Sequence, residues 1–176
     1  MCMKKIGYLC CIACLCFACK TAEKAAKEPK AKKEKTQIIT KQAEVSDKYG
    51  SPNVKQKLVN QDMFLITEFS ADSTYGYTAD NPIMVGGGGK DGVQNEKRYL
   101  NALAGPLGLP VIYKRLNSCC MFYTKNGNDL GDGKPRGLLD VYEVIHDSME
   151  EPVILYINMY DSDVLKVPVG GFTLKN

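Results

Sequence analysis

The first nineteen residues constrain this chain most, because they separate an export signal from the part that folds. Lys4 and Lys5 are followed by an apolar run over residues 6–17. About a dozen residues are too few for a membrane-spanning helix, which needs roughly 20. We therefore expect residues 1–18 to be a cleaved signal peptide. Removing them from the 176-residue chain leaves 158 residues, enough for one domain and a tether.

The signal ends in Cys16-Phe17-Ala18-Cys19, with a small residue directly before a cysteine. This ending resembles the lipobox of bacterial lipoproteins, in which that cysteine is diacylated and becomes the mature N-terminus. The resemblance implies a covalent diacylglycerol lipid on Cys19, a membrane as partner, and no other cofactor. Cys14 is a competing lipidation site. An ordinary secretory signal and an uncleaved anchor are the remaining alternatives.

Residues 19–60 are typical of a flexible tether. Residues 20–60 contain eleven Lys and five acidic residues, whereas residues 61–176 contain ten Lys or Arg and fifteen acidic residues. A segment this charged, with few large apolar side chains, cannot bury enough surface to order itself. The alternative is an electrostatic contact with anionic lipid or cell-wall polymer. Export excludes nucleic acid as a partner.

Residues 61–176 are expected to form one small α+β domain, a mainly antiparallel sheet of five or six strands with one short helix. Asn95 is the expected N-cap of a helix over residues 96–104, in which Tyr99, Leu100 and Leu103 share a face. Asn126-Gly127 and Asp132-Gly133 are the strongest turn signals. The segments with strand composition are 63–69, 83–85, 111–115, 121–124, 138–145 and 153–160.

The glycine run Gly86 to Gly89 precedes Lys90 and lies between an expected strand and the expected helix. A phosphate-binding P-loop would need glycine at Met84 and Ser or Thr at Asp91. We therefore expect these glycines to form a flexible loop and not a nucleotide site.

Cys119 and Cys120 are the only cysteines beyond Cys19, so the mature domain is not a disulfide scaffold. Neighbouring strand residues point to opposite faces, so a joint role for both requires a bend at residues 118–120. Three interpretations stay open. In the first, one thiol is buried and the other has no role. In the second, the two form a vicinal disulfide in an oxidising compartment, and in the third they serve as a redox or soft-metal site.

No catalytic set is recognisable in the domain, and no metal site is assigned. His146 is the only histidine, and its place at a strand end beside Asp147 favours a surface residue over a zinc or catalytic site. Asp140 and Tyr142 should share one face of the strand over residues 138–145, with Glu143 on the other. No spacing identifies an acid–base pair among them. We therefore favour a non-enzymatic role.

One side of the last long strand is rich in tyrosine and suits binding. It carries Tyr156, Asn158 and Tyr160, and Tyr142 lies nearby if the two strands pair. We expect this face to bind an envelope protein or a cell-wall glycan. The alternative is a small periplasmic enzyme, or a thiol-redox or metal protein, that uses Cys119 and Cys120 or a carboxylate.

Residues 73–172 contain blocks that are similar, in the same order, to a group of short outer-membrane lipoproteins of Gram-negative bacteria. Members are often named 2-dehydro-3-deoxyphosphooctonate aldolase, without assigned catalytic residues. Enzymes that make that sugar phosphate are cytoplasmic (β/α)₈ barrels of roughly 250 residues, so the name does not suit this chain. The resemblance implies an outer-membrane location. Lys20 directly after Cys19, where surface-exported lipoproteins commonly carry acidic residues, favours a domain that faces the periplasm. The blocks are Tyr75-Gly76-Tyr77-Thr78, Asn81-Pro82-Ile83, Gly86-Gly87, Asn95-Glu96, Ser118-Cys119-Cys120, the run from Gly137 to Glu143, and the run from Leu155 to Tyr160.

Overall fold

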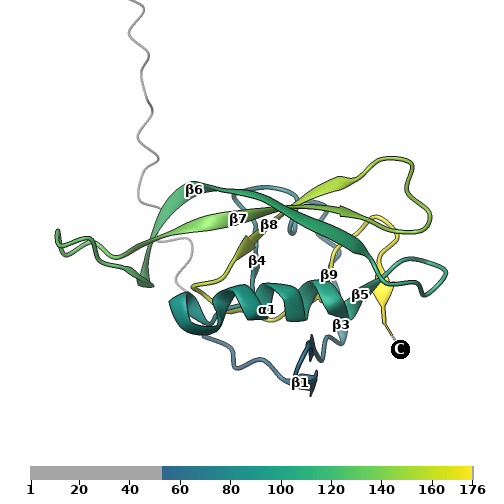
Figure 1. Cartoon of the computed structure of the whole chain (residues 1–176), viewed down its shortest axis with the longest axis horizontal. Coiled ribbons are helices and arrows are strands. Elements are labelled where there is room, and N and C mark those ends of the chain that lie inside the picture. The colour runs from purple at the N-terminus through teal and green to yellow at the C-terminus, as the bar shows by residue number, and fades with distance from the viewer. Residues whose placement is uncertain (1–52, 176) are drawn as a thin grey trace, which may run out of the picture. The chain divides into compact units, whose positions relative to one another are not determined.

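The computed structural model describes residues 53–175, which fold as short strands around one helix and one larger sheet (Figure 1). In this part of the chain no helix combines the length and the apolar character that crossing a membrane requires. The elements are β1 Leu58–Asn60, β2 Met63–Phe64, β3 Glu68–Phe69, β4 Ile83–Met84, α1 Gly88–Ala102, β5 Leu103–Ala104, β6 Ile112–Asn128, β7 Arg136–Ile145, β8 Val153–Asn158, β9 Lys166–Val167 and β10 Thr173–Leu174.

The larger sheet has the strand order β4-β8-β7-β6. β7 pairs antiparallel with both β6 and β8, whereas β4 pairs with β8 in parallel. The other strands form three two-stranded pairs, β1 with β2, β5 with β10, and β3 with β9. The expected α+β class is confirmed, and the strands are divided between one four-stranded sheet and these pairs.

α1 packs lengthwise against one face of the sheet, and the main core lies between them (Figure 1). Tyr99 and Leu100 of α1 are fully buried, as their shared helix face predicts. Leu103 is fully buried too, but it lies in β5, because α1 ends at Ala102 and not at residue 104 as expected. The helix lies so close to the chain after β8 that a Cβ on Gly92 would come within 2.7 Å of the Met159 sulfur. The opposite face of the sheet carries a smaller apolar cluster centred on Phe122 and Leu139.

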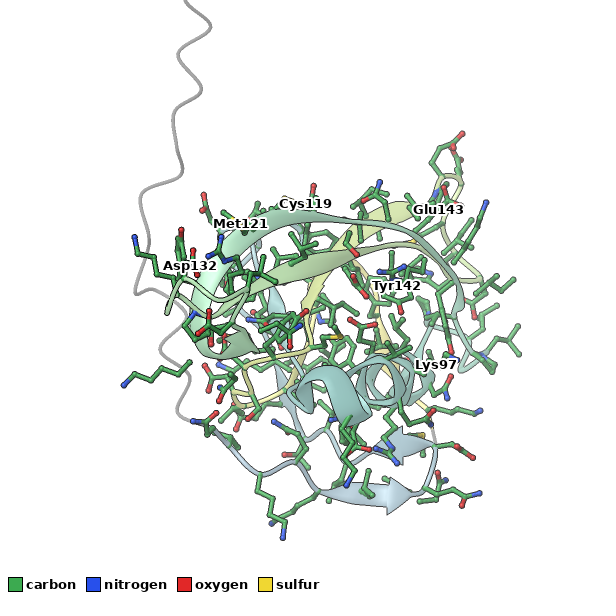
Figure 2. All side chains as sticks on the ribbon, turned by 60° about the vertical axis from the view of Figure 1, so that its left-hand side comes forward. Lys97, Cys119, Met121, Asp132, Tyr142 and Glu143 are labelled. Carbon is green, nitrogen blue, oxygen red and sulfur yellow. A yellow bond between two sulfur atoms is a disulfide. The ribbon has the colours of Figure 1, made fainter. Side chains whose placement is uncertain are left out.

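The β1–β2 hairpin covers the side of α1 that faces away from the sheet (Figures 1 and 2). The Arg98 guanidinium donates to the Gln61 carbonyl at 2.8 Å, and the Asn101 amide donates to the Asp62 carbonyl at 3.0 Å. Farther back in the chain, the Val54 N–H donates to the Ser162 carbonyl at 3.2 Å. The folded region therefore begins before residue 61, where the sequence placed its start.

α1 begins within the glycine run, so the loop expected over residues 86–89 covers only Gly86 and Gly87, and Gly88 and Gly89 belong to the helix. Gly87 is the N-cap with φ 106°, and α1 starts at Gly88. Asn95 is therefore not the N-cap but lies inside the helix. Its amide donates back to the Gly86 carbonyl at 2.9 Å, and this bond holds the turn before the helix. The left-handed backbone at Gly87 explains why a glycine serves there.

Two strand predictions also change. The expected strand over residues 63–69 is broken into β2 and β3. Residues 111–115 and 121–124 belong instead to one 17-residue strand, β6, whose pairing with β7 shifts register at three places. The expected turn at Asn126-Gly127 lies inside β6, in the shift between Tyr123 and Asn128. The β6–β7 connection follows at residues 129–135.

Asp161 ties β6 to the chain that leaves β8. Its carboxylate is fully buried and accepts hydrogen bonds from the Thr124 hydroxyl at 2.5 Å and the Asn126 amide at 2.8 Å. The Asn158 amide donates to its second oxygen at 3.0 Å. A buried carboxylate with several neutral donors is stabilised without a cation.

Candidate functional site

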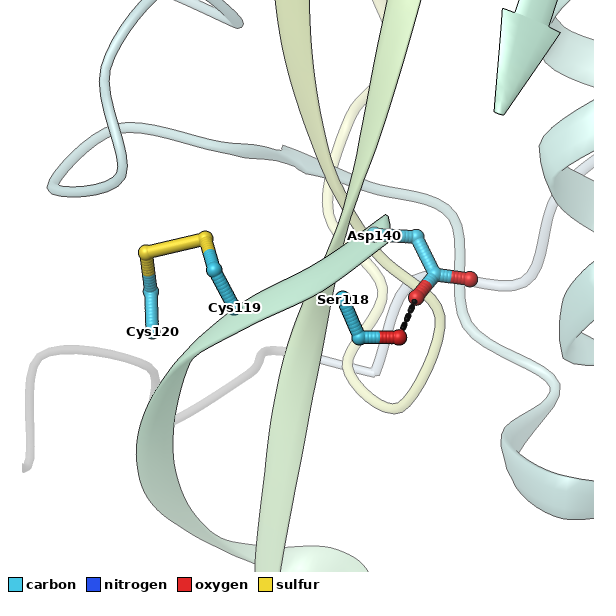
Figure 3. Close-up of a disulfide and its surroundings, with 4 residues drawn as sticks. All are labelled: Ser118, Cys119, Cys120 and Asp140. Atoms are coloured by element: carbon cyan, nitrogen blue, oxygen red, sulfur yellow. Dashed lines mark hydrogen bonds between the residues drawn. A yellow bond between two sulfur atoms is a disulfide. The ribbon is translucent and has the colours of Figure 1, made fainter. Parts of the chain in front are cut away.

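The two cysteines of the domain form a vicinal disulfide in the middle of β6 (Figure 3). The β6–β7 register shifts between Cys119 and Phe122, and Cys120 has a φ of 57°. A positive φ is uncommon for a residue with a side chain. The bend that the sequence required at residues 118–120 is therefore present, and of the three interpretations the structure has the disulfide.

The disulfide and its neighbour Ser118 lie on opposite sides of β6 (Figure 3). Cys119 packs against the smaller apolar cluster, whereas Cys120 is exposed. On the helix side, the Ser118 hydroxyl donates to Asp140 Oδ1 at 2.7 Å. β6 is thus contacted on both faces at residues 118 and 119, whereas the next residue, Cys120, is exposed.

An apolar groove of about 230 Å³ lies beside the disulfide, at the β6–β7 hairpin. Met121 is 48% exposed and Leu130 is 75% exposed, although large apolar side chains usually gain by burial. The Arg136 guanidinium stacks over the Tyr123 ring at 5.4 Å and forms an ion pair with Asp132. The groove is lined by Met121, Asn128, Leu130, Arg136, Gly137, Leu138 and Tyr160.

A buried polar network occupies the helix side of the sheet. Arg115 of β6 makes a two-pronged ion pair with Asp140 of β7, with its Nε 2.8 Å from Oδ2 and its Nη2 2.7 Å from Oδ1. The Asp140 side chain is 3% exposed and that of Arg115 is 46% exposed. The network therefore opens to solvent through the arginine.

Glu96 brings a second carboxyl group to this network from α1. It is fully buried, and the Tyr142 hydroxyl donates to its Oε2 at 2.8 Å. Burial, reinforced by the nearby negative charge of Asp140, raises the pKa of Glu96 to about 8. Its Oε1 has no hydrogen-bond partner among the described residues, and a hydrogen bond that a protonated Glu96 could donate to Asp140 adds to the rise of this pKa. At neutral pH the carboxyl group therefore keeps its proton.

The network can hold a proton, and the carboxyl group that carries this proton lies away from solvent. Glu96 is 0% exposed, so no substrate in solution touches it. Burial, with the neighbouring Glu96, also raises the pKa of the Tyr142 phenol far above its ordinary value. Asp140 and Tyr142 share a strand face, as the alternation predicted, but they serve to join helix and sheet.

The expected binding face of four residues is divided by the fold. Tyr142 pairs with Leu155 across the sheet and points toward α1, whereas Tyr156 pairs with Val141 and points to the opposite side. Figure 2 shows Tyr142 between the sheet and the helix. Asn158 is fully buried, where it bonds Asp161. Tyr156 and Tyr160 remain on the side of the disulfide, and Tyr160 lines the groove.

The remaining candidates take other places. His146 is 6% exposed, so the expectation of a surface histidine is wrong. Its Nε2 faces the Gly170 carbonyl at 3.1 Å, its Nδ1 accepts from the Ser148 N–H at 3.2 Å, and its ring packs edge-to-face on Phe172. Within residues 53–175 no group of three or more His, Cys, Asp or Glu side chains is arranged to hold a metal. Cys19 lies outside the described residues.

A more polar hollow of about 310 Å³ lies near β3 and β9. Its polar groups are largely bonded within the fold. Asp72 Oδ1 accepts from the Thr74 N–H at 2.8 Å, and Oδ2 accepts from the Asn81 amide at 2.9 Å. The Tyr75 hydroxyl accepts from the Lys166 N–H at 3.2 Å. This hollow therefore offers a ligand fewer free partners than its composition indicates.

Sequence reasoning missed the burial of Glu96. This residue lies three residues before Tyr99 and four residues before Leu100. This spacing put Glu96 on the buried helix face and was the available signal. It also missed the groove, because Met121, Leu130 and Leu138 meet only once β6 and β7 pair.

No protein-family model, curated protein or solved structure matches the chain.

Proposed function

We propose that this chain is a lipid-anchored envelope protein whose α+β domain binds another envelope protein without catalysis. Support for the anchor comes from the apolar run over residues 6–17, the Ala18-Cys19 ending and the Lys-rich tether. The resemblance of blocks within residues 73–172 to short outer-membrane lipoproteins belongs to the same proposal. Lipid on Cys19 and a place on the periplasmic side of the outer membrane are parts of this proposal.

The observation that carries the binding role is the apolar groove beside the disulfide. Its walls come from both strands of an ordered hairpin, so a partner meets a surface that is already formed. Leu130, Leu138 and Met121 remain 43–75% exposed. Tyr160 and Arg136 in the lining are of the residue types that most often dominate binding energy at protein interfaces.

The groove fits an apolar side chain of a protein better than a glycan. Glycan hydroxyls need hydrogen-bond partners when they are buried. The lining offers few, since Arg136 is already engaged with Asp132. A volume near 230 Å³ accommodates one or two side chains of a partner, which corresponds to a hot spot within a larger contact.

Crosslinking in living cells tests this role. A photoreactive amino acid at Leu130 should give a discrete crosslinked product, and the same group at Val93 on the exposed side of α1 should give none. Met121→Asp should abolish the product, whereas Val93→Asp should preserve it. The two positions match in exposure, at 48% for Met121 and 49% for Val93. A product that survives Met121→Asp would place the contact elsewhere.

A second candidate function is thiol–disulfide exchange at Cys120. The exposure of Cys120 favours it, because an incoming thiolate can reach that sulfur. A dithiol reductant would attack Cys120 and release the Cys119 thiolate, which takes up a proton. Its second thiol would then displace Cys120, leaving two protein thiols and an oxidised reductant.

Alkylation and mass spectrometry decide between a structural and an exchanging disulfide. Native protein is incubated with dithiothreitol, quenched with iodoacetamide and compared with protein unfolded in urea. Modification of Cys119 and Cys120 within seconds in the native protein supports exchange. Modification only after unfolding rules this second function out and leaves the binding role untouched.

A further inference from the structure

The connection between β5 and β6 presents a cluster of large aliphatic side chains to solvent. Leu107 is 75% exposed, Leu109 is 57% exposed, and Ile112 at the start of β6 is 74% exposed. We call these three residues the leucine loop cluster. It lies at one end of the domain formed by residues 53–175, and the β6–β7 hairpin, whose connection contains Leu130, lies at the other end (Figure 1).

The loop that carries the cluster is internally bonded. The Gly105 N–H donates to the Leu109 carbonyl and the Gly108 N–H to the Gly105 carbonyl, both at 2.9 Å. The Leu107 N–H donates to Asp147 Oδ2 at 3.1 Å. Pro106 and Pro110 have no N–H. These bonds hold the loop in shape while its aliphatic side chains point outward.

This bonding suits an apolar environment. A backbone N–H that enters lipid without a partner costs several kcal/mol, and three of the loop N–H groups already have partners. Residues 103–113 contain no charged side chain. Lys114 follows directly and is exposed, where a cation can meet anionic head groups. Asp147 beneath the loop has a side chain that is only 8% exposed.

A membrane is the partner that the chain itself would bring near. The 33 residues between Cys19 and Asn53 would span about 110 Å if fully extended, which is several times the radius of a domain of this size. An anchor at Cys19 therefore permits any face of the domain to reach the bilayer. It does not by itself choose a face.

We propose that Leu107, Leu109 and Ile112 insert into the interfacial layer of the membrane that holds the lipid on Cys19. This contact attaches the domain to the membrane in addition to the lipid, and it sets the orientation of the domain relative to the bilayer. It directs the β6–β7 hairpin and its groove away from the bilayer. The inference rests on the proposed lipid anchor.

Tryptophan fluorescence tests this insertion, because the natural chain contains no tryptophan. Mature lipidated Leu107→Trp and Leu130→Trp proteins, which begin at Cys19, are reconstituted in vesicles of phosphatidylethanolamine and phosphatidylglycerol with brominated acyl chains. The two positions are equally exposed, at 75% each. Bromine quenches only a ring that reaches the acyl region. We expect at least a twofold loss of emission at residue 107 and none at residue 130.

Co-sedimentation with the vesicles separates the two ideas. Protein that sediments without quenching at residue 107, or with equal quenching at both positions, overturns the insertion and leaves the anchor standing. Protein that does not sediment refutes the anchor and the insertion together. Leu109→Asp in the Leu107→Trp background should remove most of the quenching, whereas Val93→Asp should not change it.

Discussion

Replacing Glu96 by glutamine tests whether the buried carboxyl group holds a proton at neutral pH. In the folded chain its pKa is about 8, against an ordinary value of 4.5, chiefly because of burial and then because of Asp140. Between these two pH values folding takes up a proton. The stabilisation is therefore complete below pH 4.5 and is lost as the pH rises toward 8.

Each pH unit in this window lowers the free energy of unfolding by about 1.4 kcal/mol, so the wild type should lose about 3 kcal/mol between pH 5 and pH 7. In Glu96→Gln the side-chain oxygen still accepts the Tyr142 hydroxyl, and the amide faces Asp140 as a donor. It has no proton to lose. We therefore expect a nearly flat pH dependence over this range and a variant more stable than wild type at pH 8.

Urea unfolding of the chain without residues 1–19, between pH 5 and pH 8, measures this difference. A change of about 3 kcal/mol moves the unfolding midpoint by roughly 1–3 M urea. Glu151→Gln removes an exposed carboxyl group and should follow the wild-type curve. Wild-type and Glu96→Gln curves that fall in parallel would show that Glu96 is ionised in the fold and would refute the reasoning.

Three further substitutions, two of them with a comparison variant, test contacts of this network and of other parts of the fold. Arg115→Ala leaves the Asp140 carboxylate without its ion pair, and urea unfolding should show a loss of about 2 kcal/mol, whereas Lys114→Ala should show almost none. Gly92→Ala places a Cβ against Met159 and should lower the melting temperature by several degrees. Gly89→Ala places a Cβ that meets no atom within 4 Å, and because alanine favours the helix over glycine it should raise the free energy of unfolding by about 0.5–1 kcal/mol. Asp161→Asn replaces one accepting oxygen by an NH₂ group, so that hydrogen-bond donors face one another, and thermal unfolding should show a loss of about 1–3 kcal/mol in the free energy of unfolding. A variant that melts like wild type would contradict the bonding described for the Asp161 carboxylate.

The parts of the fold that follow local periodicity could be predicted from the sequence. The buried face of α1 with Tyr99 and Leu100 follows from helical spacing, and the shared side of Asp140 and Tyr142 follows from strand alternation. The need for a bend at the paired cysteines follows from the same alternation. Each of these depends only on neighbouring residues.

The rest depends on contacts between segments far apart in the chain. Glycines alone do not predict a helix, and α1 starts at Gly88 because Asn95 bonds the preceding turn and Met159 leaves room only for Gly92. β6 continues across the gap expected at residues 116–120 and the turn expected at Asn126-Gly127, because β7 supplies pairing partners on both sides of each. Likewise, His146 is buried because Phe172, from the end of the chain, packs against it.

The vicinal disulfide joins residues that are already neighbours, with a sequence separation of one. A crosslink stabilises a fold mainly by reducing the freedom of the unfolded chain, and that effect grows with the length of the loop it closes. Here the closed loop contains a single peptide unit, so the unfolded chain keeps almost all of its conformational entropy. The bond therefore shapes the surface at Cys120 without serving as a brace for the domain, and the chain can reach its native topology before the two sulfurs are oxidised.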